Sequence, residues 1–278
     1  TLASLDENTA YAGIGYSILS KVDDERHVVM GCSHIYNRFG EGLKYKLQKV
    51  NNPIFDRKNN PYMSYEEAYK FGTMIQNLFL ESMDKLPGRV VIHKRTHFRN
   101  DEINGIKDSL KAAGIETVEL LTIEFESERK ELPYDINRYG MGIHNYPIKR
   151  GAYIVISDNT FLLWTHGIVP SIRSESLSYY PGGIGIPAPL KITRYSGSST
   201  VQTIATEILG FTKMNWNSFN LYTKLPATIV KAEKMNALRV SSCNLSGLGF
   251  PVFGVAVATR GKHAVLAVNG DTAHNSGS

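Results

Sequence analysis

Apolar runs alternate with polar turns along the first part of the chain, which is the pattern of a sheet. Ala10–Ser20 and His27–Tyr36 are rich in apolar and β-branched residues and flank a polar turn at 21–26, so they predict a β-hairpin. Gly42–Val50 predicts a third strand. The segment 51–60 is rich in Asn, Pro and charged residues and predicts a loop.

The middle of the chain predicts helices and strands in alternation. A capping-box pattern, Ser-Tyr-Glu-Glu at 64–67, opens a helix that we expect to end at about Leu86. A second helix is predicted at Asn100–Ala113, with an N-cap and an acidic first turn. It lies between two apolar runs, Val90–His93 and Glu116–Glu124. This order predicts a βαβ unit, so part of the sheet is expected to be parallel.

The second half of the chain continues this pattern after a charged, Gly-rich excursion at 127–150. Tyr153–Ser157 and Thr160–Thr165 flank Asp158-Asn159, which is a typical two-residue hairpin turn. The remaining predicted elements are a strand at 191–195, a helix at 199–209 and a last helix at 226–240.

Composition narrows the class of protein only moderately. The 278 residues are 42% hydrophobic and 21% charged, which is typical of a globular chain of one large domain or two small ones. The net charge of +5 permits an anionic partner without demanding one, and basic residues gather at 89–99. Two cysteines make neither a disulfide framework nor a metal cage. With no signal pattern and no apolar run of about 18 residues, we expect a soluble, cytoplasmic protein without a membrane partner.

The segment 212–237 combines donors and aromatic rings in a way that suits phosphate. In it Asn215 and Asn217 lie close to four Lys, with aromatic residues between them and a single acid, Glu233. Amides and ammonium groups donate hydrogen bonds to phosphate oxygens, and flat rings can stack. The alternative is an ordinary loop followed by an amphipathic helix with a solvated Lys face.

Several blocks of this sequence are distinctive together: RVVIHKRT at 89–96, the runs at 153–157, 161–165 and 185–192, KMNWNS at 213–218 and LPATIVKA at 225–232. In this order they resemble the PIWI domain of prokaryotic Argonautes. The resemblance runs from about residue 10 to about residue 238, and several blocks in order are more specific than any one of them.

The resemblance implies an α/β fold, a ribonuclease-H-like mixed sheet flanked by helices, in a domain spanning 1–240. Active members of this family cut nucleic acid with two metal ions that clustered carboxylates hold. The matching positions here are Gly15, Arg95 and Lys231, and none of them is acidic. Positive charge at these positions repels Mg²⁺. The resemblance therefore implies a catalytically inactive domain rather than an enzyme.

The resemblance also implies contacts with the phosphates of a guide strand. The family uses its Lys-x-Asn-x-Asn segment and the helix that follows, and these contacts carry no sequence information. The expected nucleic-acid-binding residues are Lys213, Asn215, Asn217, Lys224, Lys231, Arg95 and Lys94. Local capping by the two Asn side chains remains the alternative for them.

Partners and cofactors follow from the resemblance alone. We expect a guide and a target strand, an effector protein or domain in prokaryotic defence, and a preceding MID-type domain. The chain is then either a fragment or completed by another polypeptide. No cofactor is expected, except that the family places Mg²⁺ beside the 5′ phosphate of the guide. His93 and His97 leave a strand, which gives them no zinc-binding geometry.

The tail at 241–278 departs from the family, because it ends in small polar residues instead of an apolar C-terminus. It predicts a hairpin followed by a disordered end. Two other interpretations of the whole chain stay open. One is a metal-dependent, guide-directed nuclease whose ligands lie elsewhere, which a carboxylate cluster would indicate. The other is a protein-binding scaffold, which weak, salt-insensitive binding of nucleic acid would indicate.

Overall fold

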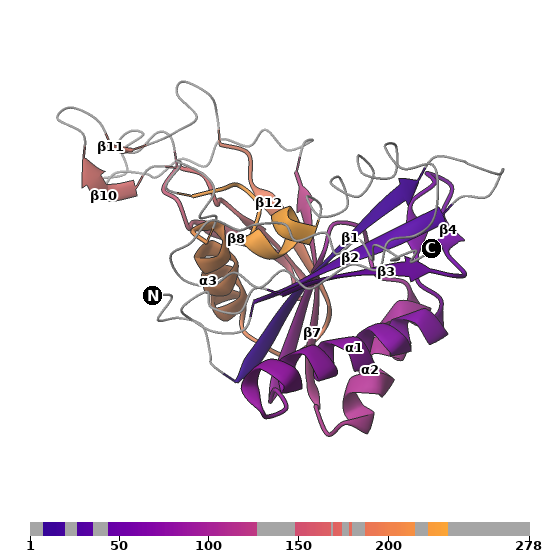
Figure 1. Ribbon diagram of the computed structural model, residues 1–278. Coiled ribbons are helices and arrows are strands. Elements are labelled where there is room, and N and C mark those ends of the chain that lie inside the picture. Colours follow the sequence, from indigo (N-terminus) through magenta and orange to yellow (C-terminus); the bar gives the residue numbers. More distant parts are fainter. Residues whose placement is uncertain are drawn as a thin grey trace, which may run out of the picture.

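The computed structural model of the chain describes residues 8–19, 27–35, 44–126, 148–167, 169–173, 178–179, 187–214 and 222–232. Residues 127–147 of the excursion predicted at 127–150 lie outside these residues, as do the tail at 241–278, the turn at 21–26, Asn215 and Asn217. A sheet runs through the middle of the molecule, with helices on both of its faces (Figure 1). The helices are α1 (Tyr65–Met83), α2 (Asn100–Ala112) and α3 (Val201–Thr212).

The main sheet has eight strands in the order β3-β2-β1-β6-β7-β12-β9-β8. These strands are β1 (Thr9–Leu19), β2 (His27–Ile35), β3 (Lys44–Val50), β6 (Arg89–Lys94), β7 (Thr117–Phe125), β8 (Tyr153–Ser157), β9 (Thr160–Leu163) and β12 (Leu190–Ser196). β1 is antiparallel to β2 and parallel to β6, and β6 is parallel to β7. The predicted hairpin, the third strand and the βαβ unit are therefore confirmed. So is the fold class, an α/β, ribonuclease-H-like mixed sheet flanked by helices.

Two short hairpins were not predicted. β4 (Ile54–Phe55), within the predicted loop at 51–60, pairs with β5 (Pro61–Tyr62), which directly follows that loop. β10 (Val169–Arg173) and β11 (Ser178–Tyr179) form a second small sheet. Strands of two residues carry too little alternation of apolar and polar positions for a sequence pattern to show.

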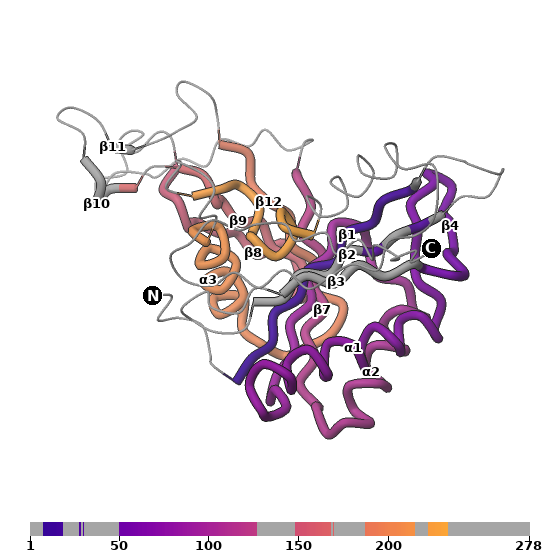
Figure 2. The backbone as a smooth tube through the Cα atoms, viewed as in Figure 1, coloured from indigo at the N-terminus to yellow at the C-terminus, as the bar shows by residue number. Residues whose placement is uncertain are grey.

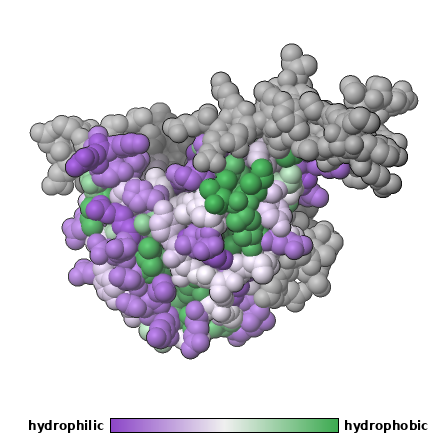
Figure 3. Space-filling model, turned by 180° about the vertical axis from the view of Figure 1, so that it is seen from behind, coloured by the Kyte–Doolittle hydropathy of each residue, from purple (hydrophilic) through white to green (hydrophobic). Residues whose placement is uncertain are grey.

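The outer strand β8 has an unusual surface. It pairs only with β9 in the main sheet, around the turn at Asp158-Asn159 that the sequence predicted. Tyr153, Ile154, Val155 and Ile156 are all exposed, at 42–53% of their surface. Apolar side chains gather on the face of the molecule that Figure 3 shows. Edge strands are commonly protected by charge or proline, and β8 has neither.

The helix starts follow capping chemistry, and the ends differ slightly from the prediction. Ser64 caps α1 by accepting from the backbone N–H of Glu67, as the capping-box pattern predicted. The helix ends at Met83 and not near Leu86, because Asp84 takes a left-handed conformation with φ of 53°. This conformation ends the helical hydrogen bonding before the proline does.

The second helix begins at Asn100, as predicted, and the third begins at Val201, two residues after its predicted start. The N-cap of α2 is Arg99, and Glu102 accepts its backbone N–H at 3.1 Å. The N-cap of α3 is Thr200, whose hydroxyl accepts from Thr203 N. Residues 227–232 of the last predicted helix are helical, and residues 233–240 lie outside the described residues.

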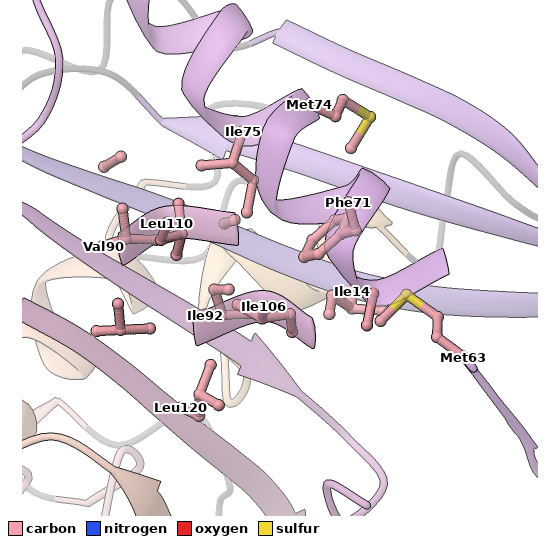
Figure 4. Close-up of a cluster of buried hydrophobic side chains, with 14 of the residues drawn as sticks. Ile14, Met63, Phe71, Met74, Ile75, Val90, Ile92, Ile106, Leu110 and Leu120 are labelled. Atoms are coloured by element: carbon pink, nitrogen blue, oxygen red, sulfur yellow. The ribbon is translucent and has the colours of Figure 1, made fainter. Parts of the chain in front are cut away.

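Two hydrophobic cores lie on opposite faces of the sheet, because successive strand residues point to opposite sides. Val90 and Ile92 of β6 belong to the core under α1 and α2, which Figure 4 shows in detail. Val91 belongs to the other core, under α3 and the segment 222–232. Figure 2 shows these two groups of helices on either side of the strands. Each fully buried aliphatic side chain contributes about 1.5–3 kcal/mol to folding.

Buried polar contacts fix α3 to the sheet. Glu207 of α3 accepts from both terminal nitrogens of Arg89 and, at 2.8 Å, from the hydroxyl of Tyr11. Glu119 of β7 accepts the backbone N–H groups of Ser198 and Ser199 at 3.2 and 2.8 Å, just before the start of the helix. These two carboxylates therefore hold both the strand ends and the helix in one arrangement.

Candidate functional site

Two of the three positions at which the resemblance implies lost carboxylates, Gly15 and Arg95, lie next to each other at the carboxyl end of β6. Ile14 of β1 pairs with Lys94 of β6, so Gly15 and Arg95 are the next residues along two parallel neighbours. Nδ1 of His93 lies 2.8 Å from the hydroxyl of Thr228. This bond joins the helical segment at 227–232 to the same strand end, and Lys231 follows Thr228 by three residues and shares its face.

Lys94 does not contribute to an open site. Its ammonium is 1% exposed and donates to both carboxylate oxygens of Glu102, at 2.6 and 2.7 Å. The rings of Tyr62 and Phe98 lie 4.6 and 5.1 Å from the nitrogen. Burial lowers the pKa of Lys94, although the Glu102 carboxylate acts in the opposite direction. The prediction that Lys94 binds nucleic acid is therefore wrong, because a phosphate cannot reach it.

The run of basic residues at 89–99 is consequently less available than its sequence indicates. Arg89 is ion-paired with Glu207 on one face of the sheet, and Lys94 with Glu102 on the other. The acids that neutralise them come from α3 and α2. Arg95 follows the strand and is half-buried at its end.

Arg95 meets Lys224 across an aromatic ring. The guanidinium carbon of Arg95 lies 4.4 Å from the ring centre of Phe125, and the Lys224 ammonium lies 4.7 Å from it. The hydroxyl of Thr165 donates to the carbonyl of Lys224 at 2.7 Å and fixes the backbone there. Burial, and next the charge of Arg95, lower the pKa of Lys224. Two like charges therefore face the same space at the end of β7.

Two further basic residues extend this arrangement. The ring centres of His166 and Tyr222 lie 5.3 Å apart, and the guanidinium carbon of Arg150 lies 4.6 Å from the Tyr222 ring centre. Burial, then the charges of Lys224 and Arg150, lower the pKa of His166. Nε2 of His166 is buried and has no hydrogen-bond partner among the described residues. We call Arg95, Arg150, His166 and Lys224 the basic cluster.

The predicted guide-binding loop starts and ends beside the basic cluster. Lys213 is exposed at the C-cap of α3, and Thr223 N donates to Thr212 O at 2.7 Å, which brings the two ends of the loop together. Asn215 and Asn217 lie outside the described residues, so their predicted roles stay predictions. Lys224 follows directly and belongs to the cluster.

Glu102, an acid near the site, is already engaged. Glu102 is a first-turn residue of α2, as predicted, but it is also buried and holds Lys94, the backbone N–H of Met63 and the hydroxyl of Tyr16. In the part of the chain that the structure describes, no three His, Cys, Asp or Glu side chains lie close enough to hold a metal ion. His93 is buried against Thr228, and His97 Nδ1 lies 3.0 Å from the hydroxyl of Tyr62. Gly15, Arg95 and Lys231 supply no oxygen ligand for a divalent cation, so they do not fit one.

A cavity of about 410 Å³ lies on the other side of Arg95. The β4–β5 hairpin forms one wall, with Arg57 and Lys58 at its tip. Thr96 and Glu124 line the opposite wall. Sequence reasoning did not find this cavity, nor Arg150, His166 and Phe125, because their partners come from distant parts of the chain.

No described helix combines the length and the apolarity needed to cross a membrane.

The mixed sheet flanked by helices is a ribonuclease-H-like fold, and solved structures of Argonautes share this fold. The Clostridium butyricum Argonaute bound to a guide DNA and a 19-mer target DNA matches with a TM-score of 0.57 and 18% identity, over 83% of this chain and 27% of that one. The Aquifex aeolicus Argonaute matches with a TM-score of 0.54, 21% identity and coverages of 83% and 29%. The Marinitoga piezophila Argonaute in complex with 5′ OH guide RNA and target DNA matches with a TM-score of 0.54, 17% identity and coverages of 83% and 30%.

These matches rest on structure and not on sequence. Neither a comparison with models of protein families nor a search of curated proteins finds a match. The chain spans less than a third of the length of the Argonautes named above. The likeness therefore establishes an Argonaute-like fold for the domain.

Proposed function

We propose that this chain is an Argonaute-like PIWI domain that holds a guide–target nucleic-acid duplex by its phosphates and does not cut it. The observation that carries the proposal is the meeting of Arg95 and Lys224 over Phe125 at the carboxyl edge of the sheet. Burial, and then the charge of Arg95, lower the pKa of Lys224, so the two cations are unfavourable together and a bound polyanion relieves their repulsion. Two of the Argonautes that share the fold are bound to guide and target strands.

The absence of cutting follows from the chemistry of the same strand ends. A two-metal mechanism needs carboxylates that hold the ions at the attacking and leaving oxygens. Gly15 of β1 and Arg95 after β6 supply none on neighbouring strands, and Lys231 adds a third non-acidic position on the helical segment. A fixed cation at Arg95 attracts the phosphate that a metal ion would otherwise bind. In this proposal the domain reports a bound duplex to a separate effector in prokaryotic defence.

The test is binding of a labelled guide–target duplex across a salt series with Mg²⁺ present, followed by a gel of the strands. The logarithm of the binding constant should fall linearly with the logarithm of the salt concentration, and the strands should stay intact. Arg95→Gln and Lys224→Gln should each make the slope less steep by about 0.9, as expected for one lost phosphate contact. Lys107→Gln, on the exposed surface of α2, is the matched control and should leave the slope unchanged.

Three outcomes would count against the proposal. Cut strands with the unmodified protein would make it a nuclease whose ligands lie elsewhere. A binding constant that does not change with salt concentration would indicate a protein scaffold that contacts nucleic acid only incidentally. Equal slopes for Lys224→Gln and the control would show that the duplex binds at another surface.

A further inference from the structure

We propose that the cavity beside Arg95 is a second phosphate subsite, into which a nucleic-acid strand held by the basic cluster continues. This inference rests on the proposed function, because it assigns an extension of the same surface. It differs in its residues, since the cavity is built by the β4–β5 hairpin and not by the segments that carry Lys224 and His166.

The hairpin wall presents cations from a rigid turn. Oδ1 of Asp56 accepts the backbone N–H groups of Lys58 and Asn60, both at 2.8 Å. Oδ2 accepts from the side-chain amide of Asn60 at 2.9 Å and from the hydroxyl of Tyr62 at 3.2 Å. These bonds lower the pKa of Asp56 to about 2, the Asn60 amide contributing most. The carboxylate is therefore committed to the turn, while Arg57 and Lys58 are exposed beside the cavity.

The opposite wall adds donors at the end of β6. Thr96 follows Arg95, and its hydroxyl is buried without a hydrogen-bond partner among the described residues. A buried hydroxyl in this state is uncommon and costs free energy unless a ligand or water satisfies it. His97 is exposed and lies 3.0 Å from the Tyr62 hydroxyl, which ties this wall to the hairpin. The cavity thus has Thr96 and His97 on this wall and the cations of Arg57 and Lys58 on the hairpin.

Arg95 belongs to both sites. It lines the cavity and also lies on the ring of Phe125, opposite Lys224. Cations therefore succeed one another across the edge of the sheet, from the hairpin through Arg95 to Lys224. A cavity of about 410 Å³ has room for a phosphate with its sugar, since ligand sites of about 300–1,000 Å³ hold molecules larger than that.

Glu124 offers a substitution that should strengthen duplex binding, whereas substitutions of the cations should weaken it. Its carboxylate lines the cavity and repels a phosphate that enters. Glu124→Gln removes that repulsion and keeps the size of the side chain, so it should tighten duplex binding a few-fold at low salt. A double variant, Arg57→Gln with Lys58→Gln, should weaken binding and make the salt slope less steep by about 0.9, one phosphate's share.

The control is Lys107→Gln with Lys111→Gln, which removes the same charge from exposed positions in the second half of α2. It should leave the slope unchanged, and melting of each variant shows whether the fold is kept. If the unmodified protein binds no duplex, the proposed function fails. If it binds and the hairpin variant behaves like the control, the subsite alone is overturned.

A second measurement separates an internal phosphate from a free nucleotide. Adenosine monophosphate is titrated into the unmodified protein, with and without a saturating duplex. Competition that raises the apparent dissociation constant of the duplex, and that the hairpin variant abolishes, supports a phosphate subsite on the path of the strand. Binding of the nucleotide that the duplex leaves unaffected would overturn the inference, because the cavity would then be an independent nucleotide site.

Discussion

His93 and Thr228 face each other across the inner surface of the sheet, with 2.8 Å between Nδ1 and Oγ1. Both side chains are fully buried. The contact joins the central strand to the helical segment that carries Lys231, and it lies two residues before Arg95. This hydrogen bond therefore helps to fix the helical segment against the strand end in an apolar core.

Removing the hydroxyl should destabilise the fold. Thr228→Val keeps the shape of the side chain and leaves the imidazole nitrogen without this partner, so the free energy of unfolding should fall by about 1–3 kcal/mol. Thr228→Ser keeps the hydroxyl and should lose less. Urea denaturation measures both variants, and equal losses would mean that the methyl group and not the hydrogen bond is important.

The stability of the protein should depend on His93 below neutral pH. Burial, then the charge of Arg89, lower the pKa of His93 from 6.5 to about 3. Between these values the unfolded chain binds a proton that the folded protein does not, so stability is fully present above pH 6.5 and falls as the pH drops toward 3.

His93→Gln removes this titration and should flatten the dependence between about pH 7 and about pH 4.5. Denaturation curves at several pH values measure it. Asp56, whose folded pKa of about 2 lies below its usual 3.8, reduces stability only at lower pH and does not interfere. A variant with the same pH dependence as the unmodified protein would contradict the prediction.

Removing Lys94 alone from its buried pair with Glu102 should destabilise the fold more than replacing both residues. Lys94→Met leaves a buried carboxylate uncompensated and should reduce stability by about 3–5 kcal/mol. Adding Glu102→Gln removes that charge but keeps an acceptor for Met63 N, so the double variant should regain part of the loss. Melting measures stability. If Lys94→Met instead lowered the salt slope of duplex binding, Lys94 would be a phosphate contact after all.

Duplex binding should tighten as the pH falls below about 7, because of His166. Burial and the charges of Lys224 and Arg150 hold the imidazole neutral in the free protein, and a bound phosphate favours its protonated form. Binding then takes up a proton. His166→Gln should bind with less pH dependence, measured by fluorescence anisotropy at constant salt. An equal pH dependence in both proteins would assign the titration to another group.

Gly197 should not tolerate a side chain. Its φ is 109°, and a Cβ there would overlap the buried carboxylate of Glu119. Gly197→Ala should lower the free energy of unfolding by at least about 1–3 kcal/mol. Gly114→Ala is the matched control, because φ is 82° and nothing lies within 4 Å of the added carbon. Equal losses at the two positions would leave only backbone strain as the cause.

Local patterns predicted the scaffold, and contacts between distant segments decided the site. The hairpin of β1 and β2 and the start of α1 at Ser64 follow from alternation and capping within a few residues. Lys94 and Arg95 are adjacent and equally basic in the sequence. They differ because one faces Glu102 in a core and the other faces Phe125 at the edge of the sheet. No single segment of the sequence shows that Lys94 is buried and that Arg95 lies at the edge of the sheet.

The strand before Arg95 is tied down along its length, by Glu207 at Arg89, by Thr228 at His93 and by Glu102 at Lys94. The separation between the cations that follow it is therefore set by the sheet and cannot adapt to the ligand. A-form and B-form duplexes present their phosphates at different spacings and groove widths. A rigid row of cations can accordingly select the helical form of a nucleic acid without contacting a single base.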